Sequence, residues 1–350
     1  MNAGAPAAPS GAGGHGRGAW LDHLFALRPL LWIPAIALFE AGRAAGGGAW
    51  WPSPRVVPAL VSLLAILGAV QLANGWNDRA GDRINRKGRE VASGVLRGRD
   101  LAVLGAALLI LAFVAATCPI VSPAARVALV GALGLGAAYV TPPLEWKRRP
   151  GLDLLAQVSG YGVVAFLLGI ESSPSAGQAL SASLARSLPY ALGIAAVGVV
   201  TMLADRTGDE AVGQRTTVVA LGPRRSVNLA LGLAVATSAA GLAVGAWAPG
   251  LWGLLAIAAA ALFAPAAPPS RAKRGIGGGE EREGWNRMAI ALQIAFVLLL
   301  LPRTPVPLLG ACVIGAAAAA HDRSRGGQGY PIRSSSLDGG EAERPGAERG

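Results

Sequence analysis

Long apolar runs dominate this 350-residue chain and constrain its fold more than any other feature. A stretch of about 18 or more apolar residues is long enough to cross the hydrocarbon core of a bilayer as a helix. Only 15% of the residues are charged, against about 25% in an ordinary soluble domain, and 53% are hydrophobic. The sequence therefore predicts an all-α, polytopic membrane protein.

The apolar runs predict nine membrane spans. They lie near residues 22–42, 56–77, 100–117, 123–141, 152–170, 187–204, 225–246, 250–268 and 286–302. A further apolar stretch at 305–320 precedes Arg323 and Arg325, which favours a tenth span; a half-helix or an interfacial segment is the alternative. The membrane domain is expected over 19–322, and the polar, glycine-rich segments 1–18 and 323–350 are expected to be disordered.

The net charge of +11 could suggest a nucleic-acid partner, but the distribution of the charge argues against one. The cations cluster after the even-numbered spans, in 79–99, 147–149, 206–225 and 271–282, whereas 171–186 has a single cation. Because loops rich in Lys and Arg stay on the cytoplasmic side, the N-terminus and every basic loop are expected there. The expected location is the cell (inner) membrane, with no nucleic acid as partner.

Two acidic motifs lie where apolar runs end, and ionisable residues at membrane depth are a functional signal. The first contains Asn74, Asp78 and Asp82, and the second contains Asp205 and Asp209. A spacing of four residues places each set on one face of a helix. Mg2+ prefers oxygen ligands of this kind and commonly bridges protein carboxylates to substrate phosphates. The spacing therefore predicts a site for Mg2+ and a diphosphate.

The two motifs follow the second and sixth spans, so four crossings separate them and both lie at the same membrane face. The chain thus divides into two four-helix halves, each with an acidic motif after its second helix, as in folds built from duplicated halves. A bundle around a central cavity would bring both motifs together. The alternative for either motif alone is that its acids pair with cytoplasmic arginines such as Arg79 and Arg83.

Cations near a departing diphosphate stabilise the charge that develops on it. Candidates are Arg89, seven residues after Asp82, and the cluster Lys147, Arg148 and Arg149. Arg215, after the second acidic motif, is a further candidate. The alternative for each is a cytoplasmic anchor that contacts no ligand.

In these residues the chain resembles the UbiA superfamily of intramembrane prenyltransferases. The two family motifs are matched by Asn74-x3-Asp78-x3-Asp82 and by Asp205-x3-Asp209 followed by Gly213-Gln214-Arg215-Thr216. Further matches are Leu27-Arg28-Pro29, Ile84-Asn85 and Tyr139-Val140-Thr141-Pro142-Pro143, in consistent order over roughly residues 20–302. One departure is Arg89-Glu90 where the family often has Arg-Pro, which adds a carboxylate near the expected diphosphate.

The resemblance implies a nine-helix bundle whose cavity opens to the cytoplasmic side and laterally to lipid. It implies that Mg2+ assists ionisation of a polyprenyl diphosphate and that a lipophilic acceptor, commonly an aromatic ring, attacks the allylic cation. The implied metal and diphosphate ligands are Asn74, Asp78, Asp82, Asp205 and Asp209. Arg89 and Lys147 would contact the phosphates, and Tyr139 and Arg215 are further substrate-binding candidates.

The details of the motifs look closer to the chlorophyll, homogentisate and menaquinone branches of the family than to haem O synthases. An aromatic or quinone-precursor acceptor is therefore the preferred expectation, and a lipid or sugar phosphate is the next. Two other functions stay open at this point. A terpene cyclase on the same scaffold would need no acceptor, and a secondary transporter would place broken helices at the membrane midplane.

Overall fold

The computed structural model describes residues 19–48, 53–85 and 89–246, together with isolated positions between 250 and 317. These described residues form helices and connecting turns, without a strand among them. The predicted spans 250–268, 286–302 and 305–320 lie largely outside the described residues, and the predicted terminal segments 1–18 and 323–350 lie entirely outside them. The count of nine or ten spans therefore stays a prediction.

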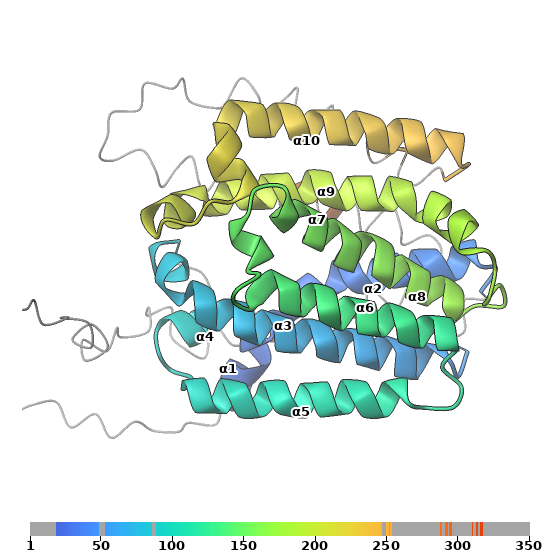
Figure 1. Ribbon diagram of the computed structural model, residues 1–350, viewed down its shortest axis with the longest axis horizontal. Helices are drawn as coiled ribbons and strands as arrows, with labels where there is room; N and C mark the ends of the chain where they lie inside the picture. The colour runs from blue at the N-terminus through green and yellow to red at the C-terminus, as the bar shows by residue number, and fades with distance from the viewer. Residues whose placement is uncertain are drawn as a thin grey trace, which may run out of the picture.

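Within the described residues, six helical segments are long and apolar enough to cross a membrane. They are Val56–Ile84 (α3), Gly98–Ala116 (α5), Pro123–Val140 (α6), Leu152–Glu171, Leu180–Ala211 (α9) and Thr217–Ala243 (α10). They run side by side in Figure 1 and coincide with the second to seventh predicted spans. The prediction of a helical membrane bundle is confirmed for this part of the chain.

The first predicted span, 22–42, is wrong as a continuous helix. The chain forms α1 (Ala19–Ala26), a short 3-10 helix η1 (Pro29–Leu31) and then α2 (Trp32–Ala45). Arg28 adopts a left-handed conformation, with φ of 51°, and Pro29 has no N–H to continue the hydrogen bonds of α1. The break therefore turns the chain at Arg28.

The span Leu152–Glu171 is also irregular. It consists of α7 (Leu152–Gln157), a π-helical segment η3 (Val158–Val164) and α8 (Ala165–Glu171). A π-helical segment changes which side chains face the neighbouring helices and is often found at functional sites. Two smaller helices, α4 (Arg89–Ala92) and the 3-10 helix η2 (Trp146–Arg148), follow α3 and α6, respectively.

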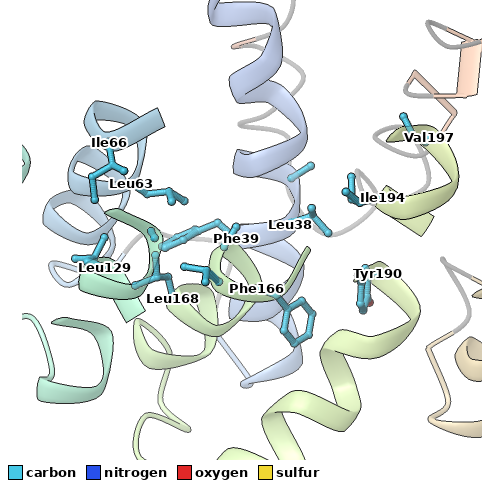
Figure 2. Packing of buried hydrophobic residues seen from close by; sticks show 14 of the residues in the cluster. Leu38, Phe39, Leu63, Ile66, Leu129, Phe166, Leu168, Tyr190, Ile194 and Val197 are labelled. Carbon is cyan, nitrogen blue, oxygen red and sulfur yellow. The ribbon is translucent and has the colours of Figure 1, made fainter. Parts of the chain in front are cut away.

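The packed interior lies between α2, α3, α6, α8 and α9. Figure 2 shows its labelled members, among them Leu38 and Phe39 of α2, Leu63 of α3 and Phe166 of α8, all fully buried. By contrast, α5 on the outside of the bundle exposes large apolar side chains: Ile110 and Phe113 are 65% and 69% exposed. Large apolar side chains in such numbers on the outside are expected where lipid replaces water as the solvent.

One buried ion pair lies within α2. Arg43 Nε donates to Glu40 Oε2 at 2.7 Å, and both side chains are almost completely buried. Pairing the two charges offsets the cost of placing each of them among apolar helices. The i,i+3 spacing of an acid and a base within an apolar run is the signal in the sequence that points to this pair.

Close approach of α2 and α8 depends on two glycines. A Cβ at Gly169 would overlap the carbonyl oxygen of Phe39, and a Cβ at Gly42 would overlap that of Phe166. Small residues at helix crossings allow backbones to approach in this way in membrane bundles. The interior packing in Figure 2 therefore rests on backbone contact as well as on side chains.

We expect Gly169→Ala to lower the free energy of unfolding by about 1–3 kcal/mol, the usual cost of forcing an extra methyl group into a packed interior. Gly131→Ala on α6 is the matched control, because a Cβ there would meet no atom within 4 Å. Thermal unfolding of both variants in the same detergent measures the difference. Equal melting temperatures for the two variants would contradict the close crossing of α2 and α8.

Candidate active site

A cavity inside the bundle brings the two acidic motifs together. Asn74, Asp78 and Asp82 reach it from the C-terminal part of α3, and Asp205 and Asp209 reach it from α9. The five side chains that the sequence singles out thus line one space, although more than 120 residues separate Asp82 from Asp205. Their role as ligands stays a prediction.

The acids of the first motif face two cations inside the cavity. Lys147 Nζ donates to Asp78 Oδ1 at 2.7 Å and to Asn74 Oδ1 at 3.3 Å, and the Lys147 side chain is only 3% exposed. Arg28 forms an ion pair with Asp82. Charge-assisted hydrogen bonds of this kind are strong where water is excluded. The cavity therefore holds two cations, each paired with a carboxylate of the first motif.

The acids of the first motif do not pair with the neighbouring arginines Arg79 and Arg83, which was the alternative interpretation. Arg79 donates to the carbonyl oxygen of Trp76 and stacks its guanidinium 4.4 Å from the Trp76 ring centroid. Arg83 donates to the carbonyl oxygen of Ala92. The ion-pair partners of Asp78 and Asp82 come from other parts of the chain, which the fold brings into the bundle.

Arg28 lies outside the six candidate spans, next to carboxylates of both motifs. Burial alone would lower the pKa of its guanidinium, but the nearby charges of Asp82, Asp205 and Asp78 raise this pKa above its ordinary value. The cation therefore stays charged in the cavity. Sequence reasoning used Arg28 only as part of a family match; the signal for its role is an arginine within an apolar run.

The loop between α6 and α7 places Lys147 in the cavity wall but leaves Arg148 and Arg149 outside it. Asn77 Nδ2 donates to the carbonyl oxygen of Val140 at 2.8 Å, which fixes the end of α6 against α3. Arg148 is exposed and lies 3.6 Å from Glu145, and Arg149 donates to the carbonyl oxygen of Pro143. Of the three predicted cations in this cluster, only Lys147 lines the cavity.

The other predicted residues are placed differently. Tyr139 of α6 lines the cavity. Arg215 is exposed and does not belong to the cavity wall. The side chain of Arg89 lies outside the described part of the structure, and Glu90, next to it in α4, is not among the residues that line the cavity.

The segment after the second motif adds a residue that sequence reasoning did not assign to the site. Gln214 is buried, and its Nε2 donates to Asp78 Oδ1 at 2.8 Å. Gly213, with φ of 73°, supplies the left-handed turn that ends α9 and brings Gln214 inward. The link from Gln214 to Asp78 connects the chain after the second motif directly to the first motif.

A buried carboxylate holds the start of α10 in place. Asp153 of α7 accepts a hydrogen bond from the Thr217 backbone N–H at 2.6 Å and another from the Thr217 hydroxyl. The Gly151 backbone N–H donates to the same hydroxyl at 2.7 Å. A carboxylate at a helix N-terminus satisfies backbone N–H groups that have no partner within the helix. Asp153 therefore fixes the turn that carries Gln214, without itself belonging to the cavity wall.

Two glycines and an asparagine join the helices that carry the motifs. Asn85, just after α3, donates from Nδ2 to the carbonyl oxygen of Asp205 at 2.9 Å and accepts from the Gly208 N–H at 3.1 Å. A Cβ at Gly208 would overlap the Asn85 amide and lie 2.8 Å from the carbonyl oxygen of Gly81. We call these contacts the α3–α9 clamp. They set the separation between the two motifs.

Beyond its charged end, the wall of the cavity is largely aliphatic. The larger apolar lining residues are Leu31, Pro34, Leu63, Ile66, Leu67, Val70, Leu135, Ile194, Val197 and Met202. A space with fixed charges at one end and mostly hydrocarbon along the rest suits an amphiphile with a polyanionic head and a long apolar tail.

The donor set fits Mg2+ held jointly by protein and substrate. In the part of the chain that the structure describes, no three Asp, Glu, His or Cys side chains are grouped closely enough to hold a metal ion unaided. The lining nevertheless supplies four carboxylates and the amide of Asn74, all oxygen donors. Mg2+ typically takes one or two carboxylates and completes its coordination shell with water and phosphate oxygens.

Comparison with protein families gives a match to the UbiA prenyltransferase family over residues 31–274. Chlorophyll synthase of Oryza sativa subsp. japonica is 26% identical over 221 residues, 58% of this chain and 56% of that protein. Digeranylgeranylglyceryl phosphate synthase of Natronomonas pharaonis is 29% identical over 212 residues, 60% of this chain and 72% of that protein. This chain therefore spans about half the length of the plant relative.

Solved structures show the same fold. A UbiA homolog from Archaeoglobus fulgidus, bound to GPP and Mg2+, superimposes with a TM-score of 0.58 at 19% identity, over 80% of this chain and 99% of that chain. The structure of a digeranylgeranylglyceryl phosphate synthase gives a TM-score of 0.54 at 16% identity, over 83% of this chain and 98% of that chain. At these identities the likeness is one of fold.

Proposed function

The chain belongs to the UbiA prenyltransferase family, and on that premise we propose that it is a Mg2+-dependent intramembrane enzyme. It transfers a polyprenyl group from a polyprenyl diphosphate to a lipophilic acceptor. The observation that carries this proposal is the polarity of the cavity, in which both acidic motifs, Arg28 and Lys147 lie at one end and mostly aliphatic residues line the rest. The GPP and Mg2+ bound by the Archaeoglobus homolog support it.

The charged end binds the diphosphate. Arg28 and Lys147 exchange part of their contact with Asp82 and Asp78 for contact with phosphate oxygens, and remain as fixed positive charges beside the leaving group. The side chains that would hold Mg2+ are Asn74, Asp78, Asp82, Asp205 and Asp209. Bound Mg2+ supplies Lewis-acid stabilisation of the charge on the departing diphosphate.

The aliphatic end binds the polyprenyl tail. Burial of each CH2 contributes about 0.8 kcal/mol to binding. In the reaction the C1–O bond breaks and its electron pair leaves with the diphosphate; the acceptor nucleophile then forms a bond to C1 and loses a proton. Residues such as Val70 and Leu135 keep water away from the allylic cation until the acceptor attacks it.

For the acceptor we propose an aromatic or quinone-precursor ring first and a lipid phosphate second. The curated relatives include a chlorophyll synthase and a digeranylgeranylglyceryl phosphate synthase, which supports a lipophilic acceptor in either case. The distribution of basic loops supports a cytoplasmic N-terminus and a cavity that opens toward the cytoplasmic side of the cell membrane.

A secondary transporter is the less favoured alternative. Transporters of this kind build their sites from helices broken at the membrane midplane. Here both acidic motifs lie in helices that continue through them, α3 over Val56–Ile84 and α9 over Leu180–Ala211. Unbroken helices that end in a charged site favour chemistry on an amphiphile over passage of a solute.

The test uses the purified full-length protein in detergent with radiolabelled geranylgeranyl diphosphate, Mg2+ or EDTA, and a panel of acceptors. The panel contains aromatic quinone precursors, a chlorophyll precursor and a prenylated glyceryl phosphate. We expect label on one acceptor in Mg2+ and none in EDTA. Mg2+-dependent diphosphate release that yields only a cyclic hydrocarbon would replace transferase by cyclase. Absence of diphosphate release at every chain length tested would overturn the proposal.

A further inference from the structure

Gln214 points inward from a turn whose other residues are exposed. The turn joins α9 to α10, and its exposed members are Ala211, Val212, Gly213 and Arg215. Gln214 is 7% exposed and lines the cavity. Burying an amide costs free energy unless it is hydrogen-bonded, and the transfer steps described above give this one no role. The contacts of Gln214 indicate what that role is.

The backbone of Gln214 belongs to a Schellman motif at the end of α9. The Gln214 N–H donates to the carbonyl oxygen of Asp209 at 2.8 Å, and the Gly213 N–H donates to that of Glu210 at 3.2 Å. The residue after the glycine of such a motif commonly makes an apolar contact with the helix, but here it is a glutamine. The motif therefore ties Gln214 to Asp209, an acid of the second motif.

The side chain of Gln214 reaches the first motif. Its Nε2 donates to Asp78 Oδ1 at 2.8 Å. An ionised carboxylate only accepts hydrogen bonds, so the amide must turn its nitrogen toward Asp78 and not its oxygen. Gln214 thus bonds to one acidic motif through its backbone and to the other through its side chain.

Asp78 is held by one of its two oxygens. Lys147 Nζ donates at 2.7 Å to Oδ1, the same oxygen that Gln214 contacts. Within the part of the chain that the structure describes, Oδ2 of Asp78 accepts no hydrogen bond. The Asp78 side chain is 20% exposed and lines the cavity. Two donors on Oδ1 fix the orientation of the carboxylate and leave Oδ2 for a ligand.

Gln214 differs from Lys147 because it carries no charge. In the proposed reaction Lys147 exchanges part of its contact with Asp78 for contact with phosphate oxygens. A neutral amide gains less from a phosphate than an ammonium does, because charge-assisted hydrogen bonds are the stronger ones. The hydrogen bond from Gln214 to Asp78 therefore remains when the diphosphate is bound, and it then holds Asp78 in place.

We propose that Gln214 is a positioning residue for Mg2+ binding. It holds Oδ1 of Asp78 so that Oδ2 is presented to the metal, and it links this orientation to the second motif through Asp209. The inference rests on the proposed function and assigns a role to a residue outside both acidic motifs. Groups that hydrogen-bond to metal ligands orient them, and their removal typically lowers metal affinity about 10–100-fold.

The test measures metal binding and does not depend on turnover. Purified full-length protein in detergent is saturated with geranylgeranyl thiolodiphosphate, in which sulfur replaces the bridging oxygen at C1 and slows ionisation. Mn2+ takes the same oxygen-rich sites as Mg2+, and electron paramagnetic resonance measures the Mn2+ that stays free. We expect Gln214→Met, which keeps the length but has no donor, to raise the Mn2+ dissociation constant about 10–100-fold. Gln214→Ala is the second variant and should have the same effect.

Thr216→Ala is the matched control in the same connection. The Thr216 hydroxyl caps α10 by accepting from the Val219 N–H, and Thr216 does not line the cavity. Loss of an N-cap destabilises a helix, so this variant should melt at a lower temperature in the absence of metal and keep the Mn2+ dissociation constant of the wild type. Gln214→Met should show the reverse, a melting temperature close to that of the wild type and weakened Mn2+ binding.

Two outcomes would overturn the assignment. One is an unchanged Mn2+ dissociation constant in both Gln214 variants. The other is that Thr216→Ala weakens Mn2+ binding as much as Gln214→Met does, which would attribute the effect to the turn as a whole and not to the amide. Failure of the proposed function would look different, since the wild-type protein itself would then bind neither Mn2+ nor the thiolodiphosphate.

Discussion

Asp205→Asn is expected to slow Mg2+-dependent release of diphosphate from geranylgeranyl diphosphate by on the order of 10²–10³-fold or more. The substitution removes a negative charge from the α9 side of the cavity. It leaves the carbonyl oxygen of Asp205, which accepts from Asn85, unchanged. The clamp between α3 and α9 therefore survives, and the loss reports on the carboxylate. Single-turnover release of diphosphate at matched protein concentration measures it.

Asp78→Asn should differ from Asp205→Asn in its effect on stability. Asp78 accepts hydrogen bonds from Lys147 and Gln214, and removal of its charge leaves the almost fully buried ammonium of Lys147 without its ion-pair partner. Breaking a buried pair from one side costs about 3–5 kcal/mol. We therefore expect Asp78→Asn to lose both activity and thermal stability. The double variant Asp78→Asn with Lys147→Met should regain stability but not activity.

The control for both variants is Glu210→Gln. Glu210 follows the second motif directly on α9, but its side chain is exposed and pairs with Arg206 at 2.7 Å. Exposed pairs of this kind contribute little, about 0–1 kcal/mol, so diphosphate release should stay close to that of the wild type. Turnover retained by Asp205→Asn at normal stability would remove this residue from the metal site.

The transmembrane helices could be predicted from sequence wherever the length of an apolar run alone determines the span. Six long apolar runs became six candidate spans because hydrocarbon thickness fixes the length of a spanning helix. Average hydropathy does not record the left-handed conformation of Arg28, which divides the predicted span 22–42, or the π-helical turn of Val158–Val164. Both irregularities arise at the cavity, where tertiary contacts override local preference.

The site could be predicted in its acids and only partly in its cations. Asp78 and Asp82 lie on the same face of one helix however the bundle packs, because their i,i+4 spacing is set within α3. Which cation meets them depends on loop geometry: Lys147 enters the cavity while Arg148 beside it stays exposed, and Arg215 is exposed as well. The contacts of Asn85 and Gln214 could not be predicted, because their hydrogen-bond partners are distant in sequence; both residues appeared only within segments that match the family motifs.

Gly208→Ala is expected to lower kcat by about 100-fold through geometry alone, because a misplacement of about 1 Å between catalytic groups can cost that much. The added methyl group would overlap the Asn85 amide and press against the carbonyl oxygen of Gly81, which is backbone and cannot swing away. The helices must then separate, and the two acidic motifs with them. The variant keeps every charged group of the cavity, so a loss of activity follows from their spacing.

Thr207→Ala is the matched control on the same turn of α9, since Thr207 is exposed. Asn85→Asp provides a second route to the same contact: its carboxylate still accepts from the Gly208 N–H but cannot donate to the carbonyl oxygen of Asp205. If the clamp sets the distance between the motifs, Gly208→Ala and Asn85→Asp should both raise the Mg2+ concentration needed for half-maximal rate. A normal Mg2+ requirement and normal kcat in Gly208→Ala would show that the site tolerates the separation, and the clamp would then be a matter of packing only.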